Sequence, residues 1–457
     1  MNKKLDEFNK FLKNKNVLIL GIGVSNLPLL EYLHEYKAKI FIRDKKKLEE
    51  LNQEVRDKIK EYKIECILGD NYLDDLTTYD IIFRSPSILP NIEALEKAKN
   101  KGILITTEIE QVIDLAPCKI IGITGSKGKT TTTTILSTIL EKLGYNVFVG
   151  GNIGTPLFNK IKDMKKDDII VLEISSFQLM NMKVSPNISI ITNISPDHLD
   201  IHKDYNEYID AKKYIFKNQT KDDILVLNEE DDIVNKMKDE TISQVRYFGS
   251  INHNNNYYIK DNDIYYNNTK IIDTSKLLLK GRHNHLNICA ALTAIKDYIN
   301  VNNNELETIV KNIKSVHHRL EYVRTINGVE WYNDSASTTP DKSMGGLNAF
   351  NKKIVLIAGG YDKNISYEDF GKPIVENCSK VILFGATKDK IYDSIIKQNS
   401  NIKIYKLSTL EEVVNKAYEI ANKDEVVLFS PASASFDMFK NVYDRGDQYQ
   451  ALIKSLD

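Results

Sequence analysis

The stretch "KIIGITGSKGKTTTTTILSTIL", Lys119–Leu140, joins an apolar run to an Ile- and Leu-rich helical pattern through glycines, a lysine and five consecutive threonines. A glycine-rich loop at a helix N-terminus exposes backbone N–H groups that can surround phosphate oxygens. From this position Lys129 can reach terminal phosphates, and the hydroxyl of Thr130 can bind Mg²⁺. The stretch therefore predicts a strand, a loop and a helix that together bind the phosphates of a nucleotide.

The glycine spacing departs from the common pattern G-x-x-x-x-G-K-[ST]. That pattern requires a glycine where this chain has Ile123, and the glycines that precede Gly128 are Gly122 and Gly125. A glycine turn that only caps a helix is the alternative interpretation. The threonine run argues against it, because β-branched residues are poor choices for starting a helix.

Apolar runs alternate with helical patterns on both sides of this stretch. Such alternation predicts parallel sheets with helical crossovers, which is an α/β fold. The pattern divides into three blocks, and we expect three domains over residues 1–116, 117–314 and 315–457. We expect the central domain to be a P-loop domain with a mainly parallel sheet, and the two flanking domains to be Rossmann-like.

The first block has its own glycine loop, "GIGVSN", in which Asn26 stands where the dinucleotide fingerprint has its third glycine. Asp44 follows 21 residues after Gly23, at the end of the next apolar run, where an acid would bind a ribose. Alone, this loop suggests an NAD-dependent oxidoreductase. With a second phosphate loop downstream, a nucleotide-linked substrate explains it equally well.

Bulk composition excludes several classes of protein. The chain has 457 residues and a formal net charge of -1, so it has no general attraction to nucleic acid or to anionic membranes. Its 4 cysteines are too widely spaced for a metal-ligand pattern or a disulfide framework. No apolar run is long enough to span a bilayer, and the N-terminus lacks the pattern of a signal peptide. We expect a cytoplasmic monomer.

Acidic and basic residues follow two apolar runs of the central block. Glu173 ends the run in "VLEISSFQL", and Asp197 and His198 follow the run in "ISIITNISPDHLD". Because the carboxyl ends of parallel strands share one edge of a sheet, these groups are candidates for Mg²⁺ beside the nucleotide. Lys212 lies 14 residues after His198. A lysine on an exposed helix is usually only solvated, and this interpretation holds for Lys213 but not necessarily for Lys212.

The motifs "GITGSKGKTTT", "GNIGTP", "LEISSFQL", "SPDHLD", "YIDAKKYIF" and "GRHNHLN" occur in the order found in the Mur ligases of peptidoglycan synthesis. With "HHRLEYV", "YNDSASTTP", "AGGYDK" and "SPASASFDMFKNVYDRGDQY", the chain resembles the D-glutamate-adding members of that family over essentially its full length. The family's phosphate loop has the glycine spacing seen here. The resemblance implies an N-terminal domain for the UDP end of the substrate, a central ATPase domain and a mobile C-terminal domain.

The resemblance also implies the reaction. ATP would phosphorylate the alanine carboxylate of UDP-N-acetylmuramoyl-L-alanine, and the amine of D-glutamate would attack the acyl phosphate, giving an amide, ADP and phosphate. Carried over residue by residue, the catalytic groups would be Lys129, His198 and Lys212. Two Mg²⁺ sites would be served by Thr130, Glu173, His198 and Lys212. Lys212 would be carbamylated by CO₂.

Substrate contacts carry over in the same way. ATP would be bound by Gly125, Ser126, Lys127, Gly128, Lys129, Thr130, Thr131, Asn284, Asn287, Arg319 and Asp334. The UDP-linked substrate would be bound by Val24, Ser25, Asp44, Ser85 and Asn152. D-Glutamate would be bound by Thr338, Lys363, Ser435 and Phe436.

Two departures concern the D-glutamate contacts: Ala336 replaces a lysine common in the family, and Val442 replaces an aromatic residue. Three alternatives stay open. The first is a sister ligase that adds another amino acid or a dipeptide, or a folylpolyglutamate synthase. The second is the oxidoreductase, which leaves Lys129 and the threonines unexplained. The third is an ATP-binding switch protein, which would not need Glu173, His198 and Lys212 together.

Overall fold

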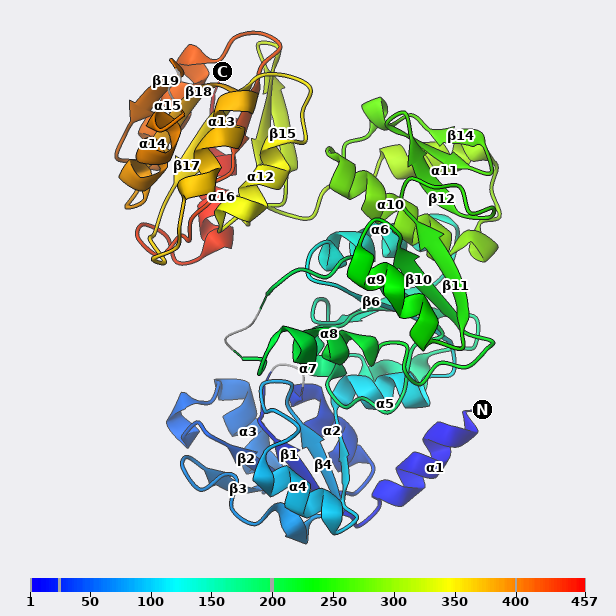
Figure 1. Ribbon diagram of the computed structural model, residues 1–457. Helices are drawn as coiled ribbons and strands as arrows, with labels where there is room; N and C mark the ends of the chain where they lie inside the picture. Colours follow the sequence, from blue (N-terminus) through cyan, green and yellow to red (C-terminus); the bar gives the residue numbers. More distant parts are fainter. Residues whose placement is uncertain (1, 24–25, 198–200, 399–400, 457) are drawn as a thin grey trace. The chain divides into compact units, whose positions relative to one another are not determined.

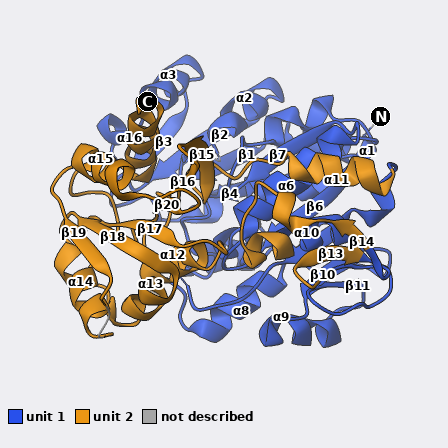
Figure 2. Ribbon diagram, turned by 90° about the horizontal axis from the view of Figure 1, so that it is seen from above, with its two compact units in different colours: residues 1–258, 266–269, 287–301 blue, residues 259–265, 270–286, 302–457 orange. Residues whose placement is uncertain are grey.

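The computed structural model describes residues 2–23, 26–197, 201–398 and 401–456 (Figure 1). Residue contacts divide the chain into two compact units (Figure 2). The first unit comprises residues 1–258, 266–269 and 287–301, and the second comprises residues 259–265, 270–286 and 302–457. The first carries the N-terminal and central sheets and the second carries the C-terminal sheet. The boundaries of the three expected domains stay a prediction.

The N-terminal sheet has the parallel order β3-β2-β1-β4-β5. Its strands are β1 (Asn16–Leu20), β2 (Lys39–Asp44), β3 (Glu65–Leu68), β4 (Ile81–Arg84) and β5 (Leu104–Thr106). The accompanying helices are α1 (Lys3–Leu12), α2 (Leu27–Glu35), α3 (Gln53–Glu61), α4 (Glu93–Asn100) and α5 (Glu108–Leu115). The strand order reverses between β1 and β4, and such a reversal opens a crevice for a ligand at the carboxyl ends.

The central sheet is also parallel, with the order β11-β10-β9-β6-β8-β7. Its strands are β6 (Lys119–Thr124), β7 (Val147–Gly151), β8 (Ile169–Glu173), β9 (Ile188–Ile191), β10 (Ile224–Asn228) and β11 (Gln244–Phe248). The helices in this part of the chain are α6 (Lys129–Lys142), α7 (Ser176–Leu179), α8 (Tyr205–Lys213), α9 (Asp232–Lys236), α10 (Arg282–Ala294) and α11 (Asn303–Lys311); residues 282–286 of α10 and all of α11 belong to the second unit. Strand β6 lies between β8 and β9, so the residues that follow these three strands meet at one edge.

The asparagine-rich segment forms the small sheet β12-β13-β14, with strands Tyr257–Lys260, Asp263–Tyr266 and Thr269–Ile272. Its two turns are Asp261–Asn262 and Asn267–Asn268, and all four residues have positive φ. Two-residue hairpin turns of type I′ require this conformation, which Asn and Asp tolerate better than other side chains. The composition of this segment is therefore explained by its turns.

The C-terminal sheet has the order β15-β16-β20-β17-β18-β19, and only β15 runs antiparallel to its neighbour. Its strands are β15 (Glu321–Ile326), β16 (Val329–Asn333), β17 (Ile354–Gly359), β18 (Cys378–Phe384), β19 (Lys403–Lys406) and β20 (Val426–Phe429). The helices are α12 (Pro340–Leu347), α13 (Gly371–Asn377), α14 (Lys388–Ile396), α15 (Leu410–Ile420) and α16 (Val442–Lys454). Apolar clusters on both faces of the sheet bury strands such as β17 completely. The predicted α/β class with mainly parallel sheets is confirmed.

Within the described ranges, no helix has the length and apolar character needed to cross a bilayer.

Candidate functional site

The loop between β6 and α6 owes its shape to two glycines. Gly125 has φ +146° and Gly128 has φ +85°, conformations that L side chains rarely adopt. A Cβ on Gly125 would overlap the hydroxyl of Thr192, and one on Gly128 would lie 2.6 Å from Asn287 Oδ1. Gly128 is also the N-cap of α6 and has no side chain to cap it. The first N–H groups of the helix are thus presented to an anionic ligand.

Polar side chains hold this loop from behind. The N–H of Ser126 donates to Asn193 O at 2.8 Å, and Ser126 Oγ lies 2.8 Å from the hydroxyl of Tyr208. Thr192 Oγ1 donates to Lys127 O at 2.7 Å. Thr192, Asn193 and Tyr208 were not among the predicted site residues. Thr192 and Asn193 could have been found from the sequence because they directly follow the buried strand β9. Tyr208 could have been found because it lies four residues, or one helical turn, before Lys212 on α8.

Lys129 folds back over the loop. Its ammonium donates to Gly125 O at 2.8 Å and to Ser126 O at 3.0 Å. Thr130 and Thr131, in the first turn of α6, are half-buried, and Lys127 is exposed. The structure therefore brings the predicted cation, the hydroxyls and the helix N-terminus together at one place, which suits a polyphosphate.

Glu173 ends strand β8 and pairs in register with Ile123 of β6. Its side chain is 1% exposed, and Oε1 accepts the amide of Asn152 at 2.8 Å. Oε2 is buried and has no hydrogen-bond partner among the described residues. A buried carboxylate oxygen is costly without a partner, so this atom fits a hard cation such as Mg²⁺.

Lys212 is buried beneath the phosphate loop rather than solvated. Its ammonium donates to Gly125 O at 3.0 Å and lies 4.4 Å from the centre of the Tyr208 ring. Burial, reinforced by the nearby Lys129 cation and partly offset by Asp197, lowers the pKa of Lys212 to about 7. A sizeable fraction of the neutral amine is therefore present at physiological pH. The predicted ligand His198 lies outside the described residues.

His202, in the segment between β9 and α8, lies close to Tyr208. It is buried, its Nε2 lies 2.9 Å from Ser176 Oγ, and its ring stacks on Phe177. The ring also meets Tyr208 edge-on, at 5.3 Å between centroids. His202 thus packs behind the loop.

A cavity of about 350 Å³ opens at the strand-order reversal of the N-terminal sheet. Asp44 and Ser85 line it together with the glycine loop. The carboxylate of Asp44 accepts the N–H of Ile22 at 2.8 Å, which holds the glycine loop against the end of β2. The predicted contacts Val24 and Ser25 lie outside the described residues, and Asn152 directly follows β7 of the central sheet.

Helix α10 carries the two predicted asparagines, both buried and one turn apart. The side chain of Asn287 packs against Gly128 and occupies the space that a Cβ there would need. Asn284 donates to Lys280 O at 2.7 Å, the residue one turn earlier.

In the second unit, Arg319 and Asp334 come together. Asp334 Oδ1 accepts the N–H of Leu320, next to Arg319, at 3.1 Å, and Oδ2 accepts the hydroxyl of Ser430 at 2.7 Å. Burial raises the pKa of Asp334 to about 6, while these hydrogen bonds and the Arg319 cation oppose the shift. Arg319 itself is exposed and Asp334 is buried.

The four predicted amino-acid contacts lie in loops at the carboxyl ends of β16, β17 and β20. Ser435 is fully buried, and its hydroxyl has no hydrogen-bond partner among the described residues. Thr338 is half-buried and Lys363 is exposed. Phe436 is 63% exposed and meets Tyr361 edge-on at 5.9 Å between ring centroids.

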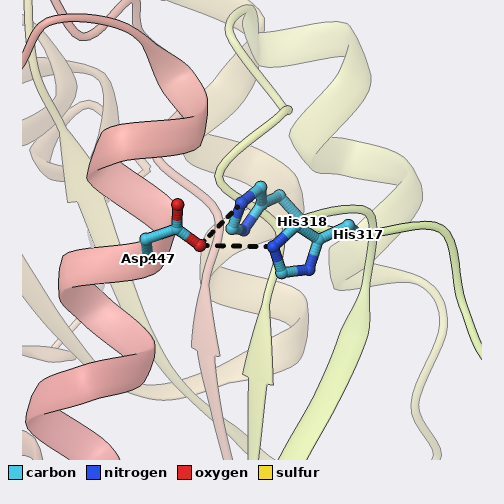
Figure 3. Close-up of side chains that lie close together, drawn as sticks. All are labelled: His317, His318 and Asp447. Carbon is cyan, nitrogen blue, oxygen red and sulfur yellow. Dashed lines mark hydrogen bonds and ion pairs between the residues drawn. The ribbon is translucent and has the colours of Figure 1, made fainter.

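One group in the described chain has the ligand types of a metal site (Figure 3). Asp447 Oδ1 lies 3.2 Å from His317 Nε2 and 3.4 Å from His318 Nε2. However, His318 Nδ1 accepts the amide of Asn333 at 2.9 Å, and that amide also donates to Gly446 O. The Asn333 orientation is set by its Oδ1, which accepts the N–H of Ser335. The proton of His318 must therefore sit on Nε2, so this nitrogen is not free to bind a cation.

Three family models match: the Mur ligase MurD-like N-terminal domain at residues 15–107, the Mur ligase middle domain at 123–295, and the Mur ligase glutamate ligase domain at 318–433. Proteins from Clostridium kluyveri and Clostridium botulinum, both named UDP-N-acetylmuramoylalanine--D-glutamate ligase, are 42% identical to this chain, over 100% of both chains in each comparison.

Solved structures share the fold. A UDP-N-acetylmuramate-alanine ligase from Thermotoga maritima is 18% identical, with a TM-score of 0.58 over 97% of this chain and 100% of that one. A MurF ligase from the same organism, solved in complex with ADP, is 18% identical, with a TM-score of 0.58 over 98% and 97%. The sequence identity to the full-length relatives, together with the three domain models, shows that this chain belongs to the Mur ligase family.

Proposed function

We propose that the chain joins D-glutamate to the alanine carboxylate of UDP-N-acetylmuramoyl-L-alanine, with ATP as the source of energy. The observation that carries this proposal is the phosphate loop with Lys129 above it and Lys212 buried beneath it, in a chain whose full-length relatives bear the name of that activity. An oxidoreductase would leave this loop unused. A switch protein would have no use for a buried lysine and a buried carboxylate beside the nucleotide.

The chemistry needs charge neutralisation. A carboxylate is a poor electrophile, so an oxygen of the alanine carboxylate attacks the γ-phosphorus of ATP and the bond to ADP breaks. The amine of D-glutamate then attacks the acyl carbon, phosphate leaves with the bonding electrons, and the amine loses a proton. The first step brings two anions together, and Lys129 and the N–H groups of α6 lower its cost by stabilising negative charge on the phosphoryl oxygens.

Magnesium would be held by Thr130, Glu173, His198 and Lys212, which we propose to serve two sites. The unpartnered Oε2 of Glu173 supports this assignment. When bound, Mg²⁺ would neutralise phosphate charge and orient the phosphoryl group for attack. The hydrogen bond from Asn152 would keep the Glu173 carboxylate in place.

We also propose that Lys212 is carbamylated. The ammonium first loses a proton, and the neutral amine then attacks CO₂: the N–C bond forms as one C=O π bond opens, and a second proton leaves the nitrogen. A cation thereby becomes an anionic oxygen ligand. Burial of Lys212 beside Gly125 O supports this, because an ammonium there is poorly solvated.

The remaining substrate contacts and the division into domains are also proposals. Asp44 and Ser85 in the N-terminal cavity would bind the UDP end, with Val24, Ser25 and Asn152. The adenine nucleotide would contact Asn284, Asn287, Arg319 and Asp334, and D-glutamate would contact Thr338, Lys363, Ser435 and Phe436. We further propose a cytoplasmic monomer with domains at residues 1–116, 117–314 and 315–457.

Phosphate release from ATP tests the activity. We expect release only when the UDP-linked muramoyl-alanine and D-glutamate are both present. A panel with L-alanine, L-lysine, diaminopimelate and D-alanyl-D-alanine in place of D-glutamate distinguishes a sister ligase. Release without any acceptor at a comparable rate would favour a switch protein and contradict the proposal.

A further inference from the structure

Arg445, on α16, is a fully buried cation in the second unit. Burial lowers its pKa to about 10, and Asp437 and Asp334 oppose the shift, so the guanidinium stays charged at neutral pH. It is not one of the residues assigned above to substrate, nucleotide or metal.

The guanidinium makes four hydrogen bonds to two loops. Nε and Nη2 donate to Ser335, to Oγ at 3.0 Å and to O at 2.8 Å. Nη1 donates to Ser433 O at 3.0 Å and to Ala434 O at 2.9 Å. Ser335 Oγ in turn donates to Val442 O at 2.7 Å, which ties the first loop to the start of α16.

A third loop is tied to the same point. Tyr361 donates its N–H to Ala434 O at 2.9 Å, so this carbonyl accepts from both Tyr361 and Arg445. Gly360 packs so closely here that a Cβ would lie 3.1 Å from Arg445 Nη1. Arg445 thus bonds directly to the loops that follow β16 and β20, and it meets the loop that follows β17 through the shared carbonyl of Ala434.

These are the loops that carry the proposed amino-acid contacts. Thr338 follows Ser335 by three residues, Lys363 follows Tyr361 by two, and Ser435 and Phe436 come directly after Ala434. We propose that Arg445 is a positioning residue that fixes the relative placement of these loops and thereby sets the affinity for the amino-acid substrate. This inference rests on the proposed function.

Arg445→Lys is the informative variant. Lysine keeps the charge but concentrates its donors on one atom, so it cannot reach the same acceptors in a fork. We expect the KM for D-glutamate to rise about tenfold or more while the KM for the UDP-linked substrate, whose proposed contacts all lie in the first unit, changes less than about twofold, because small displacements of binding groups have large effects. Hydrogen exchange should increase in peptides covering residues 333–339 and 430–437.

Arg324→Lys is the matched control, because Arg324 also donates to backbone carbonyls, those of Lys454 and Leu456 at the other end of α16. Its KM values and loop exchange should match the unsubstituted chain. If Arg445→Lys fails to fold, Ser335→Ala, which removes one acceptor of the guanidinium, should raise the same KM by a smaller factor.

The outcomes separate the two proposals. If the unsubstituted chain shows no D-glutamate-dependent phosphate release, the proposed function fails, while loop exchange in the variants still reports on Arg445. If release occurs but Arg445→Lys leaves the KM for D-glutamate unchanged, or raises all KM values alike, the positioning role is wrong.

Discussion

Two buried titratable side chains of the first unit, Lys212 and Glu108, show how burial changes chemistry at the level of single residues. Lys212 has a backbone carbonyl and an aromatic ring as its neighbours. Glu108 begins α5 and accepts the N–H groups of Leu157 and Phe158 at 2.9 and 3.0 Å. Burial disfavours the charged form of both side chains, so it lowers the pKa of Lys212 to about 7 and raises the pKa of Glu108 to about 7.

Lys212→Ala should lower kcat/KM by about 100-fold or more, because it removes a proposed ligand of Mg²⁺. Short carboxylic acids such as acetate should restore part of the activity by supplying the lost oxygen ligands. Lys213→Ala is the matched control, since Lys213 forms ion pairs with Asp210 and Glu240 at the surface. Full activity of the Lys212 variant in the phosphate assay would show that the carbamate has no role.

Glu108→Gln should make stability less dependent on pH. Burial raises the pKa of Glu108 to about 7 from an ordinary 4.5, despite the two backbone hydrogen bonds, so the folded chain binds more protons than the unfolded chain between these values. Stability of the unsubstituted chain should therefore fall as pH rises through this window, by about 3 kcal/mol at most.

Glutamine keeps an acceptor for the two N–H groups and has no charge to bury. The free energy of unfolding of the Glu108→Gln variant, measured with urea, should equal that of the unsubstituted chain near about pH 4.5. It should exceed it most above about pH 7. A difference in unfolding free energy that is the same at every pH would contradict this assignment.

Among the elements, the β6–loop–α6 unit shows most clearly how close packing constrains a sequence. The loop passes so near the end of β9 that Gly125 has no room for a Cβ. The helix that follows has Gly128 as its N-cap and no side-chain cap, an arrangement that leaves room for a ligand at its N-terminus. The five threonines continue into that helix, where Thr132 and Thr133 are buried.

Gly125→Ala should therefore weaken ATP binding strongly and lower the free energy of unfolding, by about 1–3 kcal/mol for the backbone strain alone. Gly144→Ala is the control: Gly144 also has positive φ, +94°, but no atom lies within 4 Å of the position of its Cβ. The control should lose stability without losing ATP affinity, as measured by calorimetry. Equal ATP affinity in both variants would show that the loop tolerates the extra atom.

At the scale of the whole molecule, the described residues form separate hydrophobic cores. One large cluster includes residues of both the N-terminal and central sheets in the first unit. The two faces of the C-terminal sheet have clusters of their own in the second unit. Units with independent cores unfold as independent cooperative blocks when few contacts join them.

We expect two thermal transitions that respond to different substitutions. Leu172→Ala, in the core of the first unit, should lower one transition, and Ile357→Ala, in the core of the second, should lower the other. Each should cost about 2–5 kcal/mol, as is usual for large-to-small changes at buried sites. Scanning calorimetry records both thermal transitions in one experiment. A single transition that shifts equally in both variants would mean that the units unfold together.

The sequence by itself determined the α/β class, the order of the strands along the chain and the position of the phosphate loop. These depend on local patterns: buried runs such as that ending at Glu173, glycines that need positive φ, and a lysine at a helix start. The resemblance of ordered motifs added the family, which the comparisons confirm.

Only the tertiary structure decided how these residues surround one another. Sequence spacing left open whether Lys212 is solvated, and its burial beneath Gly125 follows from the contact of α8 with the loop after β6. The roles of Tyr208 behind the loop and of Arg445 between three loops depend on contacts between segments distant in sequence. Such contacts leave no local pattern, because any strand-end loop can carry a serine or a carbonyl, and only the order of strands in the sheet makes them neighbours.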